Sequence, residues 1–312
     1  MGRRRKPAPG ARPIHGWLVV DKPSGISSAA VVARVRKALN AAKAGHGGTL
    51  DPLATGVLPV ALGEATKTVS YVMSGEKTYR FTLRWGEART TEDAEGEVTA
   101  TSEVRPERQE IEAALGDFVG EISQVPPIFS AIKVKGRRAY KLARGENRFE
   151  LPPRLVTIRD LKLLRILDPD HAEFEVICGK GVYIRSLARD LAARLGTLGH
   201  VAQLRRTRVH PFTEDMAISL DKLVALGHSA ARLELLLPVE TALDDIPALA
   251  LTENQAEALR KGRAVQVFRT DKSEPSSQMS EGTVVCVMTR GKLVALARVE
   301  HGEIRPVRVL NL

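Results

Sequence analysis

The amino-acid sequence predicts an α+β protein, because strand patterns and helix patterns are both clear and alternate along the chain. Residues 77–86 alternate apolar and polar side chains, which is typical of a half-buried strand. Residues 155–167 and 171–178 are rich in apolar side chains and are separated by a proline-containing turn, so they are predicted strands. Apolar side chains recur at helical spacing in 28–40 and 184–195.

The N-terminal part is predicted to run from a disordered basic arm into a strand and a helix. Residues 1–13 hold three prolines, two glycines and no acidic residue, so we expect them to be disordered. Residues 16–23 are a predicted strand that ends at a Pro-Ser-Gly turn. Ser27 or Ser28 can cap the following helix, which is expected to reach about Asn40.

The later elements follow from turn and cap signals. A helix is predicted over 106–117, with Pro106 in its first turn. Residues 124–140 indicate a strand, a tight turn at Gly136 and a short basic helix. Near residue 247 the composition changes, and a small β-rich tail is predicted. It should contain a helix capped by Thr252, and strands over 283–289, 293–300 and 304–310. Three parts are therefore expected: the arm 1–13, a main domain 14–246 and a tail domain 247–312.

Composition favours an acidic partner and argues against several other classes of protein. The 312 residues carry a net charge of +10, and one basic excess lies in residues 133–148. Such an excess favours a polyanion, most simply a nucleic acid, although charge runs are often only solvated faces. The two cysteines are far apart, which argues against a disulfide framework or a zinc site and suits a reducing cytoplasm. Neither a membrane helix nor a secretory signal is indicated.

The stretch 45–59 is the strongest candidate for a functional loop. It holds four glycines and two prolines, which we expect to exclude the interior of a helix or strand. Asp51 is the only acidic residue between Lys22 and Glu64, so any charge chemistry in this region falls to it. Read by composition alone, Asp51-Pro52 is a common turn opener, and a structural turn remains the plainer interpretation.

Four strings of the sequence carry a resemblance to a known family: Val20-Asp21-Lys22-Pro23-Ser24-Gly25-Ile26-Ser27-Ser28, Gly45-His46-Gly47-Gly48-Thr49-Leu50-Asp51-Pro52-Leu53-Ala54-Thr55-Gly56, residues 124–140 and residues 200–209. They resemble the TruB-type tRNA pseudouridine synthases, and the resemblance covers about residues 14–312. It implies a mixed, mainly antiparallel sheet with flanking helices, followed by a PUA-like RNA-binding domain.

The resemblance implies a reaction and a role for each matching residue. A uridine in the T loop of tRNA would be flipped out and isomerised to pseudouridine, with no redox change and therefore with no cofactor and no metal. A guanidinium beside a carboxylate favours its ionised form, as a nucleophile requires. The implied site is Asp51 as nucleophile, Arg185 paired with it, Tyr79 stacked on the base, Tyr183 beside the base, Leu204 in the uracil pocket, and His46 helping to displace the nucleotide.

Basic residues would hold the tRNA T-stem-loop through its phosphates. The RNA-backbone candidates are Lys133, Arg137, Arg138, Arg205 and Arg206. A monomer in the cytoplasm is expected. One departure from the family pattern is Thr90, which stands where many relatives have aspartate, so it is not assigned to the site.

Plainer interpretations stand beside these roles. Tyr79 and Leu204 could be ordinary sheet or core residues, and Arg185 could face solvent at a helix start, where the helix dipole does not favour a cation. For the whole protein, one alternative is a guide-RNA-dependent relative that acts on ribosomal RNA. Another is an RNA-binding folding factor without turnover.

Overall fold

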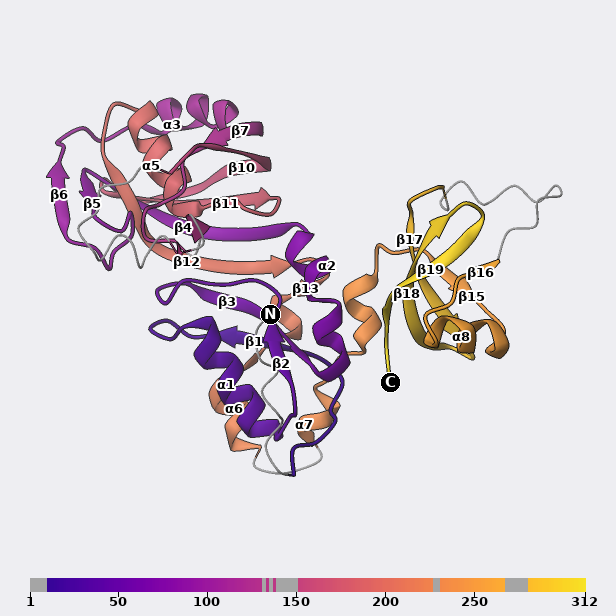
Figure 1. Ribbon diagram of the computed structural model, residues 1–312. Coiled ribbons are helices and arrows are strands. Elements are labelled where there is room, and N and C mark those ends of the chain that lie inside the picture. Colours follow the sequence, from indigo (N-terminus) through magenta and orange to yellow (C-terminus); the bar gives the residue numbers. More distant parts are fainter. Residues whose placement is uncertain (1–9, 131–132, 135–136, 139–150, 227–230, 267–279) are drawn as a thin grey trace.

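The protein consists of a long mixed sheet with flanking helices and a smaller C-terminal sheet, as Figure 1 shows. This arrangement confirms the predicted α+β class. The structure is a computed structural model, and the residues that it describes are 10–130, 133–134, 137–138, 151–226, 231–266 and 280–312.

The large sheet is mixed and mainly antiparallel. Its strands lie in the order β14-β1-β3-β12-β4-β11-β10-β7, with β13 paired to β12 and β2 paired to β3. Only the β1–β14 and β3–β12 pairs are parallel. The strands are β1 (Gly16–Lys22), β2 (Ala44–His46), β3 (Thr55–Leu62), β4 (Lys77–Trp85), β7 (Gly120–Gln124), β10 (Arg154–Asp168), β11 (His171–Cys178), β12 (Gly199–Val209), β13 (Phe212–Thr213) and β14 (Ile218–Ser219).

Helices cover the large sheet in two groups, which Figure 1 shows at opposite ends of the sheet. α3 and α5 pack on β4, β10 and β11, whereas α1 packs on β1 and β3. Tyr79 and Leu204 are partly buried and touch both clusters, so they lie where the two halves meet. The helices are α1 (Ser28–Leu39), α2 (Val69–Ser74), α3 (Arg108–Leu115), α5 (Ile184–Arg194), α6 (Leu220–Ala225) and α7 (Ala231–Glu234), with 3₁₀ turns η1 (Gly63–Lys67), η2 (Gly116–Phe118), η3 (Glu214–Met216) and η4 (Val239–Leu243).

The helix caps show why these segments begin and end where they do. The Ser27 hydroxyl accepts from the Ala30 amide at 3.2 Å, and Asn40 ends α1 in the left-handed conformation. α3 begins at Arg108, two residues later than predicted from Pro106. Glu107 is its N-cap and forms a reciprocal capping box with Glu110, which fixes the start.

The stretch 45–59 contains more regular structure than its composition predicts, so the expectation of an uninterrupted loop is wrong. β3 takes up its second half and lies inside the sheet. Gly56 has φ +98°, and a Cβ there would lie 2.2 Å from the Arg206 carbonyl oxygen, so the close strand approach requires glycine. Pro59 donates no hydrogen bond, but its carbonyl accepts from the Gly47 amide at 2.8 Å. Glycine and proline therefore serve the strand pairing here.

The C-terminal part is a five-stranded sheet in the order β15-β17-β18-β19-β16, drawn in orange and yellow in Figure 1. Its core merges with the large domain, because Cys286 and Leu296 belong to the same apolar cluster as Trp17 and Phe212. The elements are β15 (Ala248–Ala250), α8 (Glu253–Arg260), β16 (Val265–Gln266), β17 (Val284–Thr289), β18 (Lys292–Glu300) and β19 (Glu303–Val309).

Two short antiparallel hairpins complete the described structure. β5 (Glu87–Arg89) pairs with β6 (Val98–Thr101), and β8 (Lys133–Val134) pairs with β9 (Arg137–Arg138). The predicted tight turn at Gly136 lies outside the described residues. The short basic helix predicted after it is wrong at its start, because Arg137 and Arg138 form β9, and its continuation from residue 139 lies outside the described residues. Among the residues described, no helix combines the length and apolar character needed to cross a bilayer.

Candidate active site

The structure brings Asp51 and Arg185 together, although they are far apart in sequence. Asp51 lies in the turn between β2 and β3, and its side chain is 40% exposed. Arg185 lies in the first turn of α5 with only 6% of its side chain exposed. Its Nη2 is 3.0 Å from Asp51 Oδ2. Asp51 is thus a solvent-accessible carboxylate that is held by the buried guanidinium of Arg185.

The guanidinium of Arg185 is fixed by two carbonyls and a second carboxylate. Nη1 donates to the Thr91 carbonyl at 2.8 Å, and Nη2 donates to the Phe129 carbonyl at 3.0 Å. Nε lies 3.6 Å from Oδ2 of Asp93, whose side chain is 5% exposed. Asp93 was missed from the sequence, where nothing distinguishes it from the other acidic residues of its loop.

A buried lysine holds the backbone of the Asp51 turn. Lys22 is fully buried, and its ammonium donates to the carbonyls of Pro23, Pro52 and Ala54 at 2.9, 3.0 and 2.6 Å. Burial lowers the pKa of Lys22 to about 8, although the nearby Asp51 opposes this shift. The charge-assisted bonds to Pro52 and Ala54 restrain the backbone that directly follows Asp51, and the bond to Pro23 fixes the ammonium itself.

The lowered pKa of Lys22 predicts how stability changes with pH. Between pH 8 and 10.5 the unfolded chain keeps the Lys22 proton while the folded protein releases it, so this group makes folding more favourable as pH rises. In urea titrations, the unfolding free energy of the parent protein minus that of Lys22→Met should therefore increase as pH rises from 8 to 10.5. A constant difference between the two proteins would show that Lys22 does not titrate there.

Ser28 and Arg206 hold the remaining backbone of the turn. The Ser28 hydroxyl accepts from the Leu50 amide at 2.8 Å and donates to the Leu50 carbonyl at 2.9 Å. Arg206 is 1% exposed and donates to the carbonyls of Val57 and Gly48 at 2.9 and 3.1 Å. The expectation that Arg206 contacts RNA phosphate is wrong, because its guanidinium is enclosed by backbone carbonyls.

Tyr79 lies opposite Arg206 in the β4–β12 ladder. Burial raises the pKa of the Tyr79 phenol, and the Arg206 guanidinium opposes that shift. Leu204 lies opposite Phe81 in the same ladder. Arg206 thus connects the Asp51 turn with Tyr79, so one buried side chain fixes the relative position of two predicted site residues.

Arg205 is more exposed than Arg206, because consecutive residues of a strand point to opposite faces of the sheet. Its side chain is 39% exposed and forms ion pairs with Asp21 at 3.0 Å and Glu214 at 2.5 Å. An RNA phosphate would have to compete with these two carboxylates. Sequence reasoning treated Arg205 and Arg206 alike, whereas the structure gives them different environments.

Tyr183 and His46 are also near the site. Tyr183 is the N-cap residue of α5, and the Gln124 amide group bonds both its backbone N–H and its carbonyl, at 2.8 and 3.1 Å. Burial raises the pKa of Tyr183. Burial, followed by the charge of Arg206, lowers the pKa of His46. Both effects favour the neutral form of the His46 ring, which suits stacking.

For Lys133, Arg137 and Arg138 the structure gives only the backbone. They lie in the β8–β9 hairpin, where Lys133 is paired with Arg138. Residues 139–148 of the predicted basic segment lie outside the described residues.

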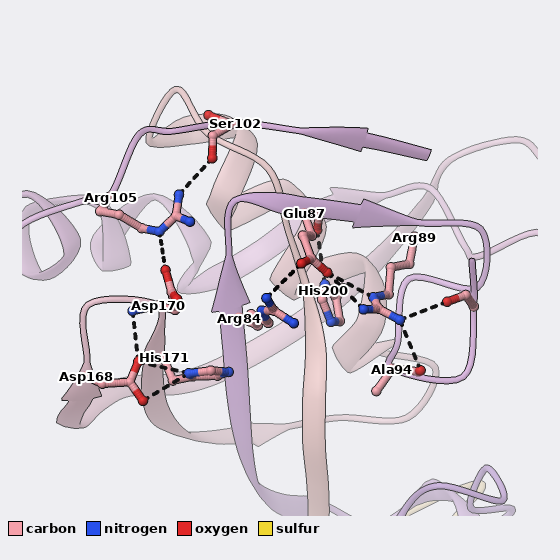
Figure 2. A network of polar contacts seen from close by, with 11 residues as sticks. Arg84, Glu87, Arg89, Ala94, Ser102, Arg105, Asp168, Asp170, His171 and His200 are labelled. Atoms are coloured by element: carbon pink, nitrogen blue, oxygen red, sulfur yellow. Dashed lines mark hydrogen bonds and ion pairs between the residues drawn. The ribbon is translucent and has the colours of Figure 1, made fainter. Parts of the chain in front are cut away.

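The loop between β5 and β6, which carries Asp93, is held at its base by the polar contacts that Figure 2 shows. Glu87 pairs with Arg84 at 2.7 Å and with Arg89 at 2.9 Å, and the Glu87 carbonyl lies 3.0 Å from Nδ1 of the buried His200. Arg89 also donates to the Gly96 carbonyl at 3.0 Å. These contacts close the loop of residues 90–96 against the large sheet.

Thr90 has a turn-forming role in this loop. Its backbone amide donates to the Glu97 carbonyl at 2.9 Å, and its hydroxyl accepts from the Glu97 amide at 3.1 Å. Thr90 therefore closes the loop that presents Asp93.

Within the described residues, one cluster has the spacing of metal ligands: His210, Asp244 and Asp245, with ligand atoms within 4.8 Å of one another. Arg208 Nη2 lies 2.9 Å from His210 Nδ1, and a guanidinium can only donate, so Nδ1 must accept. The other ring nitrogen, Nε2, lies 2.8 Å from a carboxylate oxygen of Asp245 but has no hydrogen-bond partner of good geometry. Because the Arg208 guanidinium already occupies Nδ1, we do not assign a metal site to this cluster.

A cavity of about 470 Å³ opens beside the Asp51 turn, but it is not the proposed site itself. Leu53 and Leu204 contribute to its lining, together with the polar residues Arg80, Thr82 and Glu173, whereas Asp51 and Tyr79 do not. We place the chemistry at Asp51 because the paired charges are there.

Comparisons with known proteins agree with this geometry. Residues 36–184 match the family described as TruB family pseudouridylate synthase (N terminal domain), and residues 185–244 match the tRNA pseudouridylate synthase B C-terminal domain. The tRNA pseudouridine synthase B of Rhodospirillum rubrum is 55% identical over 312 residues and covers both chains fully. That of Caulobacter vibrioides is 52% identical over 313 residues, also with full coverage of both.

A solved structure shares the fold. The archaeal box H/ACA sRNP Nop10–Cbf5 complex contains a chain that is 26% identical, with a TM-score of 0.71, covering 95% of this protein and 86% of that chain. Fold, site and full-length identity above 50% point the same way, and the chain belongs to the TruB family of pseudouridylate synthases.

Proposed function

We propose that this protein isomerises the T-loop uridine of tRNA to pseudouridine, with Asp51 as the catalytic carboxylate. The observation that carries the proposal is the half-exposed Asp51 side chain, held 3.0 Å from a buried Arg185. In the reaction the N1–C1′ bond breaks, the uracil turns while bound, and C5 bonds to C1′. The C5 proton leaves and N1 gains a proton, so the product is an isomer of the substrate.

Asp51 has three possible actions: attack at C1′, attack on the base, or removal of a proton. Each of them requires the ionised carboxylate, which the guanidinium of Arg185 favours. Tyr79 supplies an aromatic face for the flipped base, and stacking contributes about 1–3 kcal/mol per base. The Tyr79 hydroxyl is also a candidate for the later proton transfer at C5. His46 would occupy the stacking position that the base leaves, which offsets part of the cost of flipping.

The rest of the chain would bind the tRNA. Lys133, Arg137, Arg138 and Arg205 remain candidates for phosphate contacts, and Leu204 and Tyr183 remain candidates for contact with the base. We assign the catalytic domain to residues 14–246, a PUA-like RNA-binding domain to 247–312, and a basic arm to 1–13. We further propose a monomer that acts in the cytoplasm without metal or cofactor.

A base-by-base map of pseudouridine in tRNA, with and without the protein, tests this function. A bare T-stem-loop transcript should be modified without any guide RNA, which separates the proposal from a guide-dependent enzyme. Modification only with an added guide would favour that alternative. Tight binding with no pseudouridine at any position would favour an RNA-binding folding factor.

Binding of tRNA should weaken steeply with salt if phosphate contacts dominate. The logarithm of affinity should fall against the logarithm of salt concentration with a slope of about −0.7 to −0.9 per phosphate contacted. Arg205→Gln should make the slope shallower by about one unit. Arg194→Gln is the matched control, because Arg194 also pairs with a carboxylate but lies at the far end of α5. An unchanged slope for Arg205→Gln would mean that Arg205 serves Asp21 and Glu214 alone.

A further inference from the structure

α5 carries two arginines one helical turn apart, and both reach the same two segments of the chain. Arg185 donates to the carbonyls of Thr91 and Phe129. Arg189 bonds Glu92 Oε1 at 2.5 Å and the Val125 carbonyl at 3.0 Å. Residues four apart in a helix lie on one face, so Arg189 repeats the bracing pattern of Arg185 one turn further from Asp51.

Glu92 occupies the position between the two groups that hold Arg185. Thr91, which precedes it, supplies the carbonyl, and Asp93, which follows it, supplies the second carboxylate. Glu92 has φ +61°, in the left-handed region that non-glycine residues rarely adopt. Such a conformation persists only where the surroundings hold it. The Glu92 side chain is 18% exposed, so its ion pair with Arg189 is largely shielded from water.

We propose that the Glu92–Arg189 ion pair is a positioning element for the pseudouridylation reaction. It fixes the segment Thr91–Asp93 on α5, so that this segment holds the Arg185 guanidinium toward Asp51. The inference rests on the proposed function of Asp51. Neither Glu92 nor Arg189 needs to touch the RNA, and both act through Arg185.

The loop of residues 90–96 is also held by contacts that do not involve Arg189. Loss of the Glu92–Arg189 ion pair should therefore shift the loop without unfolding the protein. The Val201 amide donates to the Glu92 carbonyl at 3.1 Å, and the Ala94 amide donates to the Val201 carbonyl at 3.0 Å, so β12 holds the loop from one side. Arg89 closes it at the base, as Figure 2 shows. Within the described contacts, Arg189 is the side chain that ties Glu92 to α5. Burial raises the pKa of Glu92 although Arg189 opposes this, so the charged pair forms against a desolvation cost.

The test compares Glu92→Gln, Arg189→Gln and the double variant in single-turnover reactions with saturating tRNA. Each single variant should react about ten- to a hundredfold more slowly, with a Kd for tRNA within twofold of the parent. The double variant should be no slower than Arg189→Gln, because that change already breaks the ion pair with Glu92 together with the contacts of Arg189 with Asp190 and the Val125 carbonyl. Arg194→Gln is the control, because it breaks an exposed ion pair on the same helix.

Three results would overturn the inference: unchanged single-turnover rates in folded variants, a rate loss explained by weaker tRNA binding, or additive losses in the double variant. If the glutamine variants do not fold, Glu92→Asp and Arg189→Lys keep both charges and decide the matter. They should fold, and they should show a smaller loss of rate with unchanged Kd. The proposed function is judged separately, because it fails only if the parent protein itself forms no pseudouridine.

Discussion

Asp51→Asn is expected to abolish pseudouridine formation while tRNA remains bound. Asparagine has nearly the same shape as aspartate, and the turn is held through the backbone by Lys22, Ser28 and Arg206, so the fold should persist. The lost group is the negative charge that every proposed step requires. We expect the single-turnover rate to fall by at least about 10³-fold, the scale of losing an essential catalytic group.

Release of tritium from C5-labelled uridine in a T-stem-loop measures this loss, since the C5 hydrogen leaves as C5 bonds to C1′. Filter binding measures tRNA affinity in the same samples. Asp117→Asn is the matched control, because Asp117 also pairs with an arginine of α5, at 2.7 Å, but lies away from the site. Residual turnover of Asp51→Asn at even a tenth of the parent rate would discredit the catalytic assignment.

Arg185→Met should give the second large effect, on both rate and stability. The change removes the guanidinium from Asp51, leaves the buried Asp93 without its counter-charge, and leaves the carbonyls of Thr91 and Phe129 without their donor. Breaking a buried ion pair on one side typically costs about 3–5 kcal/mol of stability. We expect the single-turnover rate to fall by about 10²-fold or more, because the Asp51 carboxylate loses both the group that orients it and its counter-charge.

Arg185→Lys distinguishes charge from geometry. A lysine keeps the positive charge, but its compact ammonium cannot span both carboxylates and both carbonyls as a planar guanidinium does. Its stability should therefore lie between those of the parent and Arg185→Met in urea titrations, and its rate should remain well below the parent rate. A lysine variant with the parent rate would show that only the charge matters.

Local sequence patterns correctly predicted those helices and strands whose conformation depends on residues nearby in the sequence. The alternation of Phe81, Leu83 and Trp85 placed β4, and all three side chains are buried as a half-buried strand requires. Glycine and proline in 45–59 misled the prediction, because Gly56 and Pro59 fit into β3 through contacts with other strands. Composition cannot show whether a glycine lies in a loop or in a strand where a neighbouring backbone approaches closely.

The resemblance carried by the sequence motifs identified Asp51 and Arg185, and the structure places them 3.0 Å apart. The same motifs could not distinguish the roles of Arg205 and Arg206, which are neighbouring residues of the same type. Only the packing of the sheet decides which of its two faces is buried. It puts Arg206 beneath the Asp51 turn and Arg205 against two carboxylates.

The sequence by itself determined the class of fold, the order of the main elements and the carboxylate to which the proposed chemistry is assigned. These rest on periodicity, caps and continuous strings, all of which are local. The tertiary structure alone assigned Asp93, Glu92 and Arg189 to the surroundings of that carboxylate. Their partners lie more than ninety residues away along the chain, and the pairing of such distant charges is set by how α5 packs on the sheet rather than by any neighbouring residue.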